Sequence, residues 1–446
     1  ESLCQGKSLK DFATGHLYYG LHKTNNGWVF REWAPNATHI YLIGDFNNWT
    51  KNSQFQLKRL ENGNWEAYLP ENFIQHGQKY KLLVFWNEGS AYRIPSYATY
   101  VIQDPLTLIF DAVVWNPDQK FEWKHPNFKP TFKYPLIYEA HIGMSSEEEK
   151  ISTYNEFTEK ILPRIKRLGY NTIQLMAVQE HPYYGSFGYH VSSFFAASSR
   201  FGTPDDLKKL IDTAHGMGIA VVMDIVHSHA VKNELEGLGM FDGSPSQYFH
   251  TNWRRFHPAW DSLCFNYSKC EVIHFLLSNC QFWLTEYNFD GFRFDGVTSM
   301  IYLDHGLGKN FTNYEMYYDG NQDEDAITYL TLANKMIHDI NPNAITIAEE
   351  MSGMPGLGAK FNDGGYGFDY RLAMGIPDYW IKIIKEKPDE YWNMNELFHE
   401  LTTRRVEEKT ISYTESHDQA LVGDKTIIFR LADKEMYFNM AKDKTN

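Results

Sequence analysis

The 446-residue sequence has no long hydrophobic run and few cysteines. No stretch of about 18 apolar residues occurs and the N-terminus lacks a signal-peptide profile, so neither a membrane span nor secretion is predicted. The four cysteines form no Cys-x-x-Cys pair and have no metal-site spacing. We expect Cys270 and Cys280, which fall in a helical pattern, to be reduced and mostly buried. These features favour a cytoplasmic protein.

Basic residues are also scarce relative to acidic ones. The 42 Lys and Arg against 56 Asp and Glu give a formal charge of −14, which argues against nucleic acid or an anionic membrane as partner. No glycine-rich phosphate loop accompanies a strand-to-helix turn, so we expect no nucleotide or redox cofactor. A neutral polymer would tolerate this charge, and aromatic residues, 16% of the chain, suit stacking on sugar rings as well as packing. A monomer is the default expectation.

The stretch FDGFRFDGV, residues 289–297, places an arginine and an aspartate in an apolar strand. Side chains two positions apart share one face of a strand, so Arg293 and Asp295 would point the same way. The cation would lower the pKa of Asp295 and keep it ionised, as a carboxylate nucleophile requires. A structural ion pair at a strand end explains this stretch equally well.

Three other strand-like stretches end in acidic or histidine residues. Charged groups at the ends of several apolar strands separated by helical patterns predict a parallel α/β barrel with its site at the carboxyl ends of the strands. The three are IAVVMDIVHSH (219–229), AITIAEE (344–350) and TISYTESHD (410–418). With FDGFRFDGV they supply strands three, four, five and seven, and the first, second and sixth are PLIYEAHIG, NTIQLMAV and YGFDYRLAMG.

Ahead of the barrel, residues 15–112 consist of short alternating segments separated by Asn- and Gly-rich turns, which predict an antiparallel β-sandwich of roughly 100 residues. We interpret residues 1–14 as the remnant of a leader and 113–134, which contains three prolines, as a linker to the barrel over 135–446. Tryptophans of the sandwich would bind sugar or pack in the interior, and packing is favoured for most of Trp33, Trp49, Trp65 and Trp86.

Taken in order, the four acid-tipped stretches resemble the four signature regions of the α-amylase family of glycoside hydrolases and transglycosylases. Their neighbourhoods over about residues 15–436 are similar to the 1,4-α-glucan (glycogen or starch) branching enzymes of that family: YEAHIGMSSEEEKISTYNEF, EHPYYGSFGYHVSSFF, RFDGVTSM, AEEMSGMP and YTESHDQALVGDKT. The sandwich resembles the starch- and glycogen-associated module that precedes such barrels.

The resemblance implies a (β/α)8-type barrel, but the eighth strand and the all-β C-terminal domain of the family have no room after Gly423. We therefore expect a barrel truncated before strand eight, with an exposed apolar edge.

The resemblance also implies the catalytic residues. Retaining cleavage of a glycosidic bond needs two carboxyl groups, one as nucleophile and one as general acid and base. By match to the family motifs, Asp295 is the nucleophile and Glu349 the general acid and base. Periodicity alone could not choose between Glu349 and its neighbour Glu350, which would point to the other side of the strand. Asp418 is the third carboxylate, which binds sugar hydroxyls in this family.

Five further residues match substrate-binding positions of the family. Arg293 would hold the nucleophile ionised, and Asp224 would support Arg293 from the third strand. His229 and His417 would donate hydrogen bonds to the sugar at the cleavage point, and Tyr189 would stack on that sugar. Weaker candidates for the rim of the site are His141, His190 and His227.

A departure from the family bears on metal binding. Many α-amylases carry an asparagine, a calcium ligand, immediately before the histidine that corresponds to His229. This sequence has Ser228 there, a poorer ligand for a cation that prefers six to eight oxygens. We therefore expect no structural calcium and no other cofactor.

The segments VTSM after Asp295 and QALVGDKT after Asp418 are similar to branching enzymes and differ from typical amylases. They imply transfer of an α-1,4-glucan piece to a 6-hydroxyl, with glycogen, amylose or amylopectin as substrate. The loop over residues 305–320, rich in Tyr and Asn, would hold a glucan chain or form ordinary rim packing. The alternatives are a debranching or amylase-type hydrolase and a truncated glucan-binding protein without turnover.

Overall fold

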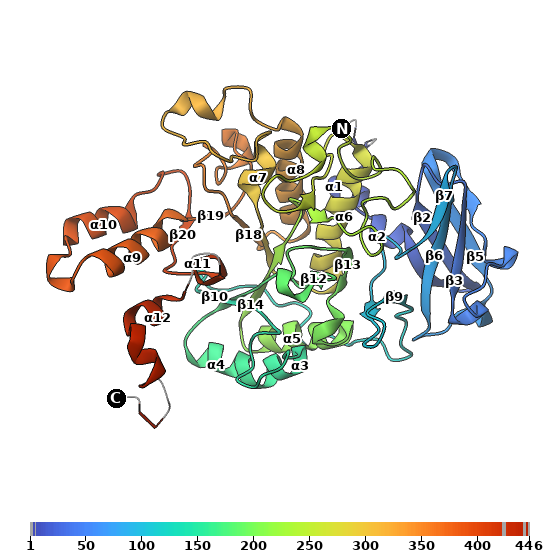
Figure 1. Ribbon diagram of the computed structural model, residues 1–446, viewed down its shortest axis with the longest axis horizontal. Helices are drawn as coiled ribbons and strands as arrows, with labels where there is room; N and C mark the ends of the chain where they lie inside the picture. Colours follow the sequence, from blue (N-terminus) through green and yellow to red (C-terminus); the bar gives the residue numbers. More distant parts are fainter. Residues whose placement is uncertain (1–2, 5, 422–424, 440–442, 445–446) are drawn as a thin grey trace.

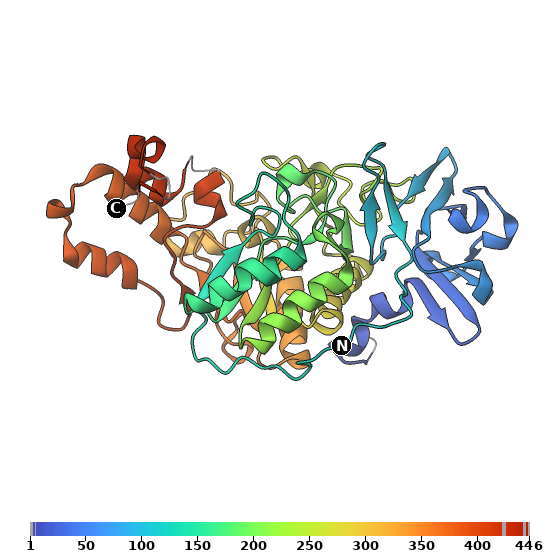
Figure 2. The ribbon, with the colours of Figure 1, turned by 90° about the horizontal axis from the view of Figure 1, so that it is seen from below.

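The computed structural model describes residues 3–4, 6–421, 425–439 and 443–444. An N-terminal β-sandwich lies at one end of the long axis, a parallel sheet surrounded by helices lies in the middle, and α9, α10 and α12 project at the other end (Figure 1). Figure 2 shows the segment after the sandwich running along the outside of the helical layer before it enters the central sheet.

The N-terminal domain is the antiparallel sandwich that the alternating segments predict. In β5 and β6 buried side chains alternate with more exposed ones, because one face of each strand packs between the two sheets. One sheet has the order β1-β2-β5-β4: β1 (Gly20–Thr24), β2 (Gly27–Trp33), β5 (Asn64–Leu69) and β4 (Lys58–Arg59). The other has the order β3-β6-β9-β8, with β7 on β6: β3 (His39–Gly44), β6 (Lys79–Trp86), β9 (Phe110–Val113), β8 (Val101–Gln103) and β7 (Gly89–Arg93).

Most of the sandwich tryptophans pack against protein. Trp65 is buried, and Trp33 meets Tyr248 of the central domain edge to face at 5.4 Å. Trp86 covers the backbone of Gly243 so closely that a Cβ there would lie 2.2 Å from the indole. Trp49 is half-buried, and its Nε1 donates to Asp45.

The central sheet has seven parallel strands that lie side by side in chain order, and each falls within the stretch predicted for it. They are β10 (Ile137–Ala140), β11 (Thr172–Leu175), β14 (Ala220–Ile225), β17 (Gly291–Phe294), β18 (Ile345–Ala348), β19 (Tyr370–Leu372) and β20 (Thr410–Ile411). The α/β fold and its strand order are therefore confirmed. Over the described ranges, β20 does not pair back to β10, so the sheet is an open half-barrel.

Helices cover the sheet and follow the signals in the sequence. Thr203 caps α5 by accepting from the backbone N–H of Asp206, and Pro204 is its first residue. The helices after the sandwich are α3 (Tyr154–Glu156), α4 (Leu162–Arg167), α5 (Pro204–Gly216), α6 (Cys270–Glu286), α7 (Val297–Ile301), α8 (Glu324–Ile340), α9 (Gly375–Glu386), α10 (Met394–Thr402), α11 (His417–Leu421) and α12 (Ile427–Ala432), with a π-helical turn at Phe157–Ile161. Two small antiparallel sheets pair β12 (Gln179–Glu180) with β13 (Ser193–Ala197) and β15 (Ala230–Val231) with β16 (Ser262–Leu263).

The segment between β9 and β10, predicted as a linker, has no helix or strand of its own but is fixed to α5. The Asp212 carboxylate accepts from the backbone N–H groups of Lys124 and His125. Further along, the Phe128 ring stacks on His215 at 4.2 Å. These contacts fix the path by which the chain enters the sheet.

Residues 1–14 include the helix α1 (Leu9–Phe12), while residues 1–2 and 5 lie outside the described ranges, and their interpretation as a leader remnant stays a prediction. The next helix, α2 (Gly15–Tyr18), is tied to α6 because the backbone N–H of Gly15 donates to Ser278. The expectation that Cys270 is buried is wrong, since it occupies the exposed first turn of α6.

The other cysteines behave as their sequence context predicts. Cys280 is buried as expected, and all four cysteines are free thiols. No helix within the described ranges combines the length and the apolar character needed to cross a bilayer.

The close approach of β17 and β18 depends on Gly291. This residue has φ +148°, and a Cβ there would lie 1.9 Å from the carbonyl oxygen of Ile345. We predict that Gly291→Ala lowers the free energy of unfolding by about 3–5 kcal/mol, since overlap adds to backbone strain. Gly77→Ala, at φ +85° in open space, should cost about 1–2 kcal/mol. Urea unfolding of both variants measures this, and equal losses would contradict it.

Candidate active site

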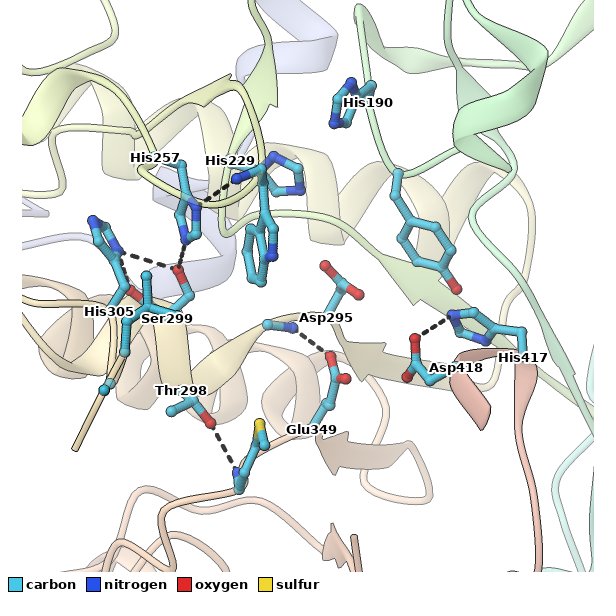
Figure 3. Close-up of a pocket in the computed structure, with 17 residues that line it drawn as sticks. His190, His229, His257, Asp295, Thr298, Ser299, His305, Glu349, His417 and Asp418 are labelled. Atoms are coloured by element: carbon cyan, nitrogen blue, oxygen red, sulfur yellow. Dashed lines mark hydrogen bonds and ion pairs between the residues drawn. The ribbon is translucent and has the colours of Figure 1, made fainter. Parts of the chain in front are cut away.

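A cavity of about 420 Å³ opens at the carboxyl ends of β17 and β18 (Figure 3). Its wall is dominated by ionisable and aromatic side chains that come from the strand ends and from the loops that follow them. They are Tyr189, His190, His229, His257, Trp260, Asp295, His305, Glu349, His417 and Asp418. A parallel α/β sheet binds its ligands at this edge, and the sequence predicted the site there.

At the floor of the cavity, one buried guanidinium gathers three carboxyl groups. Nη1 of Arg293 donates to Asp224 at 2.7 Å and to Asp295 at 2.8 Å. Nη2 of the same side chain lies 3.1 Å from a carboxylate oxygen of Glu349. The three acids come from the ends of β14, β17 and β18, which are neighbours in the sheet. The predicted ion pair is thus the centre of a larger cluster.

Strand geometry explains this convergence. Arg293 is paired in register with Asp224 of β14 and with Ile347 of β18. Phe292 and Phe294 point to the opposite face and are fully buried among the helices. Gly296 then turns the chain at φ +62°, and its N–H donates to Glu349 at 2.7 Å.

The adjacent acids Glu349 and Glu350 point to different sides, as alternation requires. Glu349 lines the cavity. Glu350 is buried away from it, where its carboxylate pairs with Arg371 at 3.2 Å and accepts from the backbone N–H groups of Ser352 and Gly353. Only Glu349 is therefore available to a molecule in the cavity.

The charges of the cluster do not balance, and this changes one expectation. Burial and the neighbouring Glu349 raise the pKa of Asp295 to about 7, although Arg293 opposes the shift. Burial likewise raises the pKa of Asp224 to about 7 and raises that of Glu349. The expectation that Arg293 would hold the pKa of Asp295 low is wrong, because burial and the neighbouring Glu349 outweigh the effect of the guanidinium. Asp295 and Glu349 consequently titrate as a pair.

The third predicted carboxylate, Asp418, reaches the cavity from α11 (Figure 3). Asp295, Glu349 and Asp418 border the same space, although more than a hundred residues separate the first from the last. The next residue back, His417, has its Nε2 3.3 Å from a carboxylate oxygen of Asp418.

His417 is held by a residue that the sequence analysis missed. Its backbone N–H and its Nδ1 both bond the carboxylate of Glu139 on β10, at 2.9 and 2.8 Å. Burial lowers the pKa of His417, but the carboxylates of Glu139 and Asp418 outweigh it and raise the pKa to about 9. His417 is therefore an imidazolium at neutral pH.

Tyr189 and His229 complete the predicted set. The Tyr189 ring stacks on His417 at 5.1 Å, and its hydroxyl donates to Asp224 at 2.7 Å. His229 is buried at the cavity wall, and its Nδ1 has no hydrogen-bond partner within the described ranges. Burial holds the pKa of His229 well below its usual value, so the ring is neutral.

Of the weaker candidates, only His190 lines the cavity. His227 is a core residue whose ring nitrogens bond Tyr329 and Asn279, and His141 packs among aromatic rings. The prediction that His227 lies at the rim is wrong, because its ring is fully buried and both ring nitrogens are bonded in the core.

One wall of the cavity comes from loops that have no periodic pattern. Trp260 stacks on His257 at 4.0 Å, and Nε2 of His257 donates to Ser299 at 2.7 Å. His305 and Leu307 also line the cavity, so the loop 305–320 contributes to its rim as hypothesised.

The sequence contains one pattern that could have indicated Glu139. This residue is an acid in an otherwise apolar strand, two positions from His141.

The ranges that the structure describes contain no group of three or more His, Cys, Asp or Glu side chains arranged to hold a metal ion. The Ser228 hydroxyl lies 3.4 Å from a carboxylate oxygen of Asp295.

Comparison with known proteins identifies two matching families and a set of curated relatives. Residues 18–98 match the family described as carbohydrate-binding module 48 (isoamylase N-terminal domain), and residues 144–246 match the alpha amylase catalytic domain. The chain is 53% identical over 441 residues to a 1,4-alpha-glucan-branching enzyme of Dictyostelium discoideum and 51% identical to that of Equus caballus. Each match covers 97% of this chain but only 64% and 63% of the relative, so the chain spans somewhat less than two thirds of their length.

Solved structures support the fold alone. The catalytic module of the glycogen-degrading pneumococcal virulence factor SpuA aligns with a TM-score of 0.67 at 18% identity, over 90% of this chain and 62% of that one. The GBS pullulanase SAP in complex with maltotetraose aligns with a TM-score of 0.66 at 20% identity, over 90% and 57%.

The raised pKa of Asp295 predicts a pH-dependent cost to stability. Because its folded pKa of about 7 lies above the ordinary 3.8, the protein loses stability as pH rises from about 4 to about 7. Asp295→Asn removes this loss. The variant should gain stability relative to the wild type between pH 4 and pH 8, on the order of 1–3 kcal/mol. Urea unfolding at both pH values measures the difference, and the same difference at pH 4 and pH 8 would refute it.

Proposed function

We propose that the chain belongs to the branching enzymes of the α-amylase family, and that it cuts an α-1,4-glucan and transfers the piece to a 6-hydroxyl, making an α-1,6 branch. The observation that carries the proposal is the contact of one guanidinium with both Asp295 and Glu349. Retaining glycosidases hold their two carboxyl groups about 5–5.5 Å apart, and two acids on one arginine suit that spacing.

In the first step Asp295 attacks the anomeric carbon. The bond from that carbon to Oδ of Asp295 forms, the bond to the leaving O4 breaks, and Glu349 gives its proton to O4. The raised pKa of Glu349, caused by burial and by neighbouring carboxylates, keeps this proton available near neutral pH. Arg293 stabilises whichever carboxyl group is ionised at each stage.

In the second step a 6-hydroxyl of another glucan chain attacks the glycosyl ester. Glu349, now ionised, accepts the hydroxyl proton, the new bond to O6 forms, and Asp295 leaves as a carboxylate. Asp418, His229 and His417 would bind hydroxyls of the sugar, Tyr189 would pack against it, and Asp224 would hold Arg293 and Tyr189 in place. The covalent intermediate preserves the bond energy until an acceptor arrives.

The proposed substrate is a neutral α-glucan such as glycogen, amylose or amylopectin. The net charge of −14 and the aromatic cavity wall fit a polysaccharide better than a nucleic acid or an anionic membrane. We further propose that the protein acts as a monomer in the cytoplasm, where its free thiols would remain reduced.

Incubation of the protein with amylose tests the proposal. Branching should lower and blue-shift the iodine absorbance while producing almost no new reducing ends. Steady release of reducing ends would instead identify a hydrolase, and binding to amylose without either change would identify a glucan-binding protein.

Two adjacent variants separate chemistry from folding. Glu349→Gln should lower the branching rate by about 10²–10⁴-fold with little change in the urea midpoint, because it removes the general acid. Glu350→Gln should lower stability, because Arg371 loses a buried partner, while each folded molecule keeps its branching rate. The reverse pattern in the two variants would contradict the assignment of Glu349.

A further inference from the structure

The two edge strands of the central sheet are β10 and β20. Over the described part of the chain, β10 and β20 are not hydrogen-bonded to each other, and a cavity of about 350 Å³ separates them. Ile137 and Glu139 line it from one side, and Leu372 and Ile411 line it from the other. The segment after β20, which leads to His417 and Asp418 at the start of α11, is therefore not held in place by a strand pairing with β10.

Glu139, near the carboxyl end of β10, bridges this gap by contacting His417. One carboxylate oxygen accepts the backbone N–H of His417 at 2.9 Å, and the other bonds the ring Nδ1 of the same residue at 2.8 Å. A bond to the main chain fixes where His417 lies, and a bond to the ring fixes how it is turned. Gln174 of β11 donates to Glu139 at 3.3 Å and orients the carboxylate.

We propose that Glu139 is a positioning residue, which holds the start of α11, with His417 and Asp418, against β10 so that both side chains face Asp295 and Glu349. The consequence for turnover rests on the function proposed above, whereas the contact itself is measurable without turnover. Glu139 is not one of the residues that line the cavity of about 420 Å³ with Asp295 and Glu349, but it lines the cavity between the edge strands.

The charges around His417 make this role measurable. Its ring faces Glu139 of β10, Asp418 of its own helix, Arg293 of β17 and the stacked ring of Tyr189, with His141 close enough to interact. Burial and Arg293 favour the neutral imidazole, and the two carboxylates favour the cation. With the pKa raised to about 9, the stabilisation from this pair is complete below the ordinary 6.5 and is lost as pH rises through 9.

Glu139→Gln keeps the shape and an acceptor oxygen but removes the charge. We expect NMR titration of labelled histidine to show the pKa of His417 falling by at least about one unit. In the variant only Asp418 still raises this pKa, while burial and Arg293 continue to lower it. We expect kcat for branching to fall roughly 10–100-fold with little change in KM, because a small misplacement of Asp418 is costly. The loss of kcat should be larger at pH 8 than at pH 6, because His417 of the variant remains charged at pH 6.

Glu139→Asp, which retains the charge on a shorter side chain, should restore most of the pKa of His417 and part of kcat. It also provides a second test if Glu139→Gln folds poorly.

Asp369→Asn is the matched control. Asp369 precedes β19 at the opposite end of the sheet, where its carboxylate bonds His338 at 2.9 Å and the backbone N–H of Thr346. Burial lowers the pKa of His338, but the bond to Asp369 outweighs it and raises that pKa. This variant should lower the pKa of His338 while leaving the pKa of His417 and the branching kinetics unchanged.

An unchanged pKa of His417 in folded Glu139→Gln would overturn the proposal, and so would a kcat equal to that of the wild type. If the wild type shows no branching at all, the pKa of His417 still decides whether Glu139 holds it. The failure of this proposal is thus distinguishable from the failure of the proposed function.

Discussion

The burial of the Arg293 guanidinium is the constraint on which the rest of the site depends. A buried cation without partners costs several kcal/mol, so this side chain requires carboxylates close to it. The register of β14 and β17 places Asp224 directly opposite Arg293. Asp295, two residues after Arg293, contacts the same guanidinium. Because neighbouring parallel strands end at the same edge of the sheet, Glu349, which follows β18, lies beside the same guanidinium.

One cation among three carboxyl groups leaves the cluster short of positive charge. Burial and mutual repulsion raise the pKa of Asp295, Asp224 and Glu349, so the group retains protons at pH values where exposed carboxyls have lost theirs. Such a cluster is poorly suited to stabilising a fold, yet it suits chemistry in which one carboxyl attacks while another donates a proton. A second cation, the imidazolium of His417, lies at the far side of the cavity beside Asp418.

The sequence was sufficient for those parts of the site that lie on regular strands. Strand alternation and the position of strand ends predicted that Arg293 and Asp295 share a face, and that Glu349 and Glu350 point to opposite sides. Glu139 was missed because its partner, His417, is 278 positions away in the sequence. His257 and Trp260 lie in a long loop without periodicity, so no local pattern indicated that they would meet the cavity. The pKa of Asp295 was misjudged because it depends on burial and on the approach of Glu349, which only the assembled sheet reveals.

Trapping the covalent intermediate tests the central claim most directly. Incubation with a fluorinated maltosyl substrate, in which fluorine slows breakdown of the glycosyl ester, followed by peptide mapping by mass spectrometry, locates the attached sugar. The account predicts one adduct, on the peptide that contains Asp295, and none in Asp295→Asn. An adduct on Glu349 or Asp418, or turnover that persists in Asp295→Asn without any adduct, would contradict it.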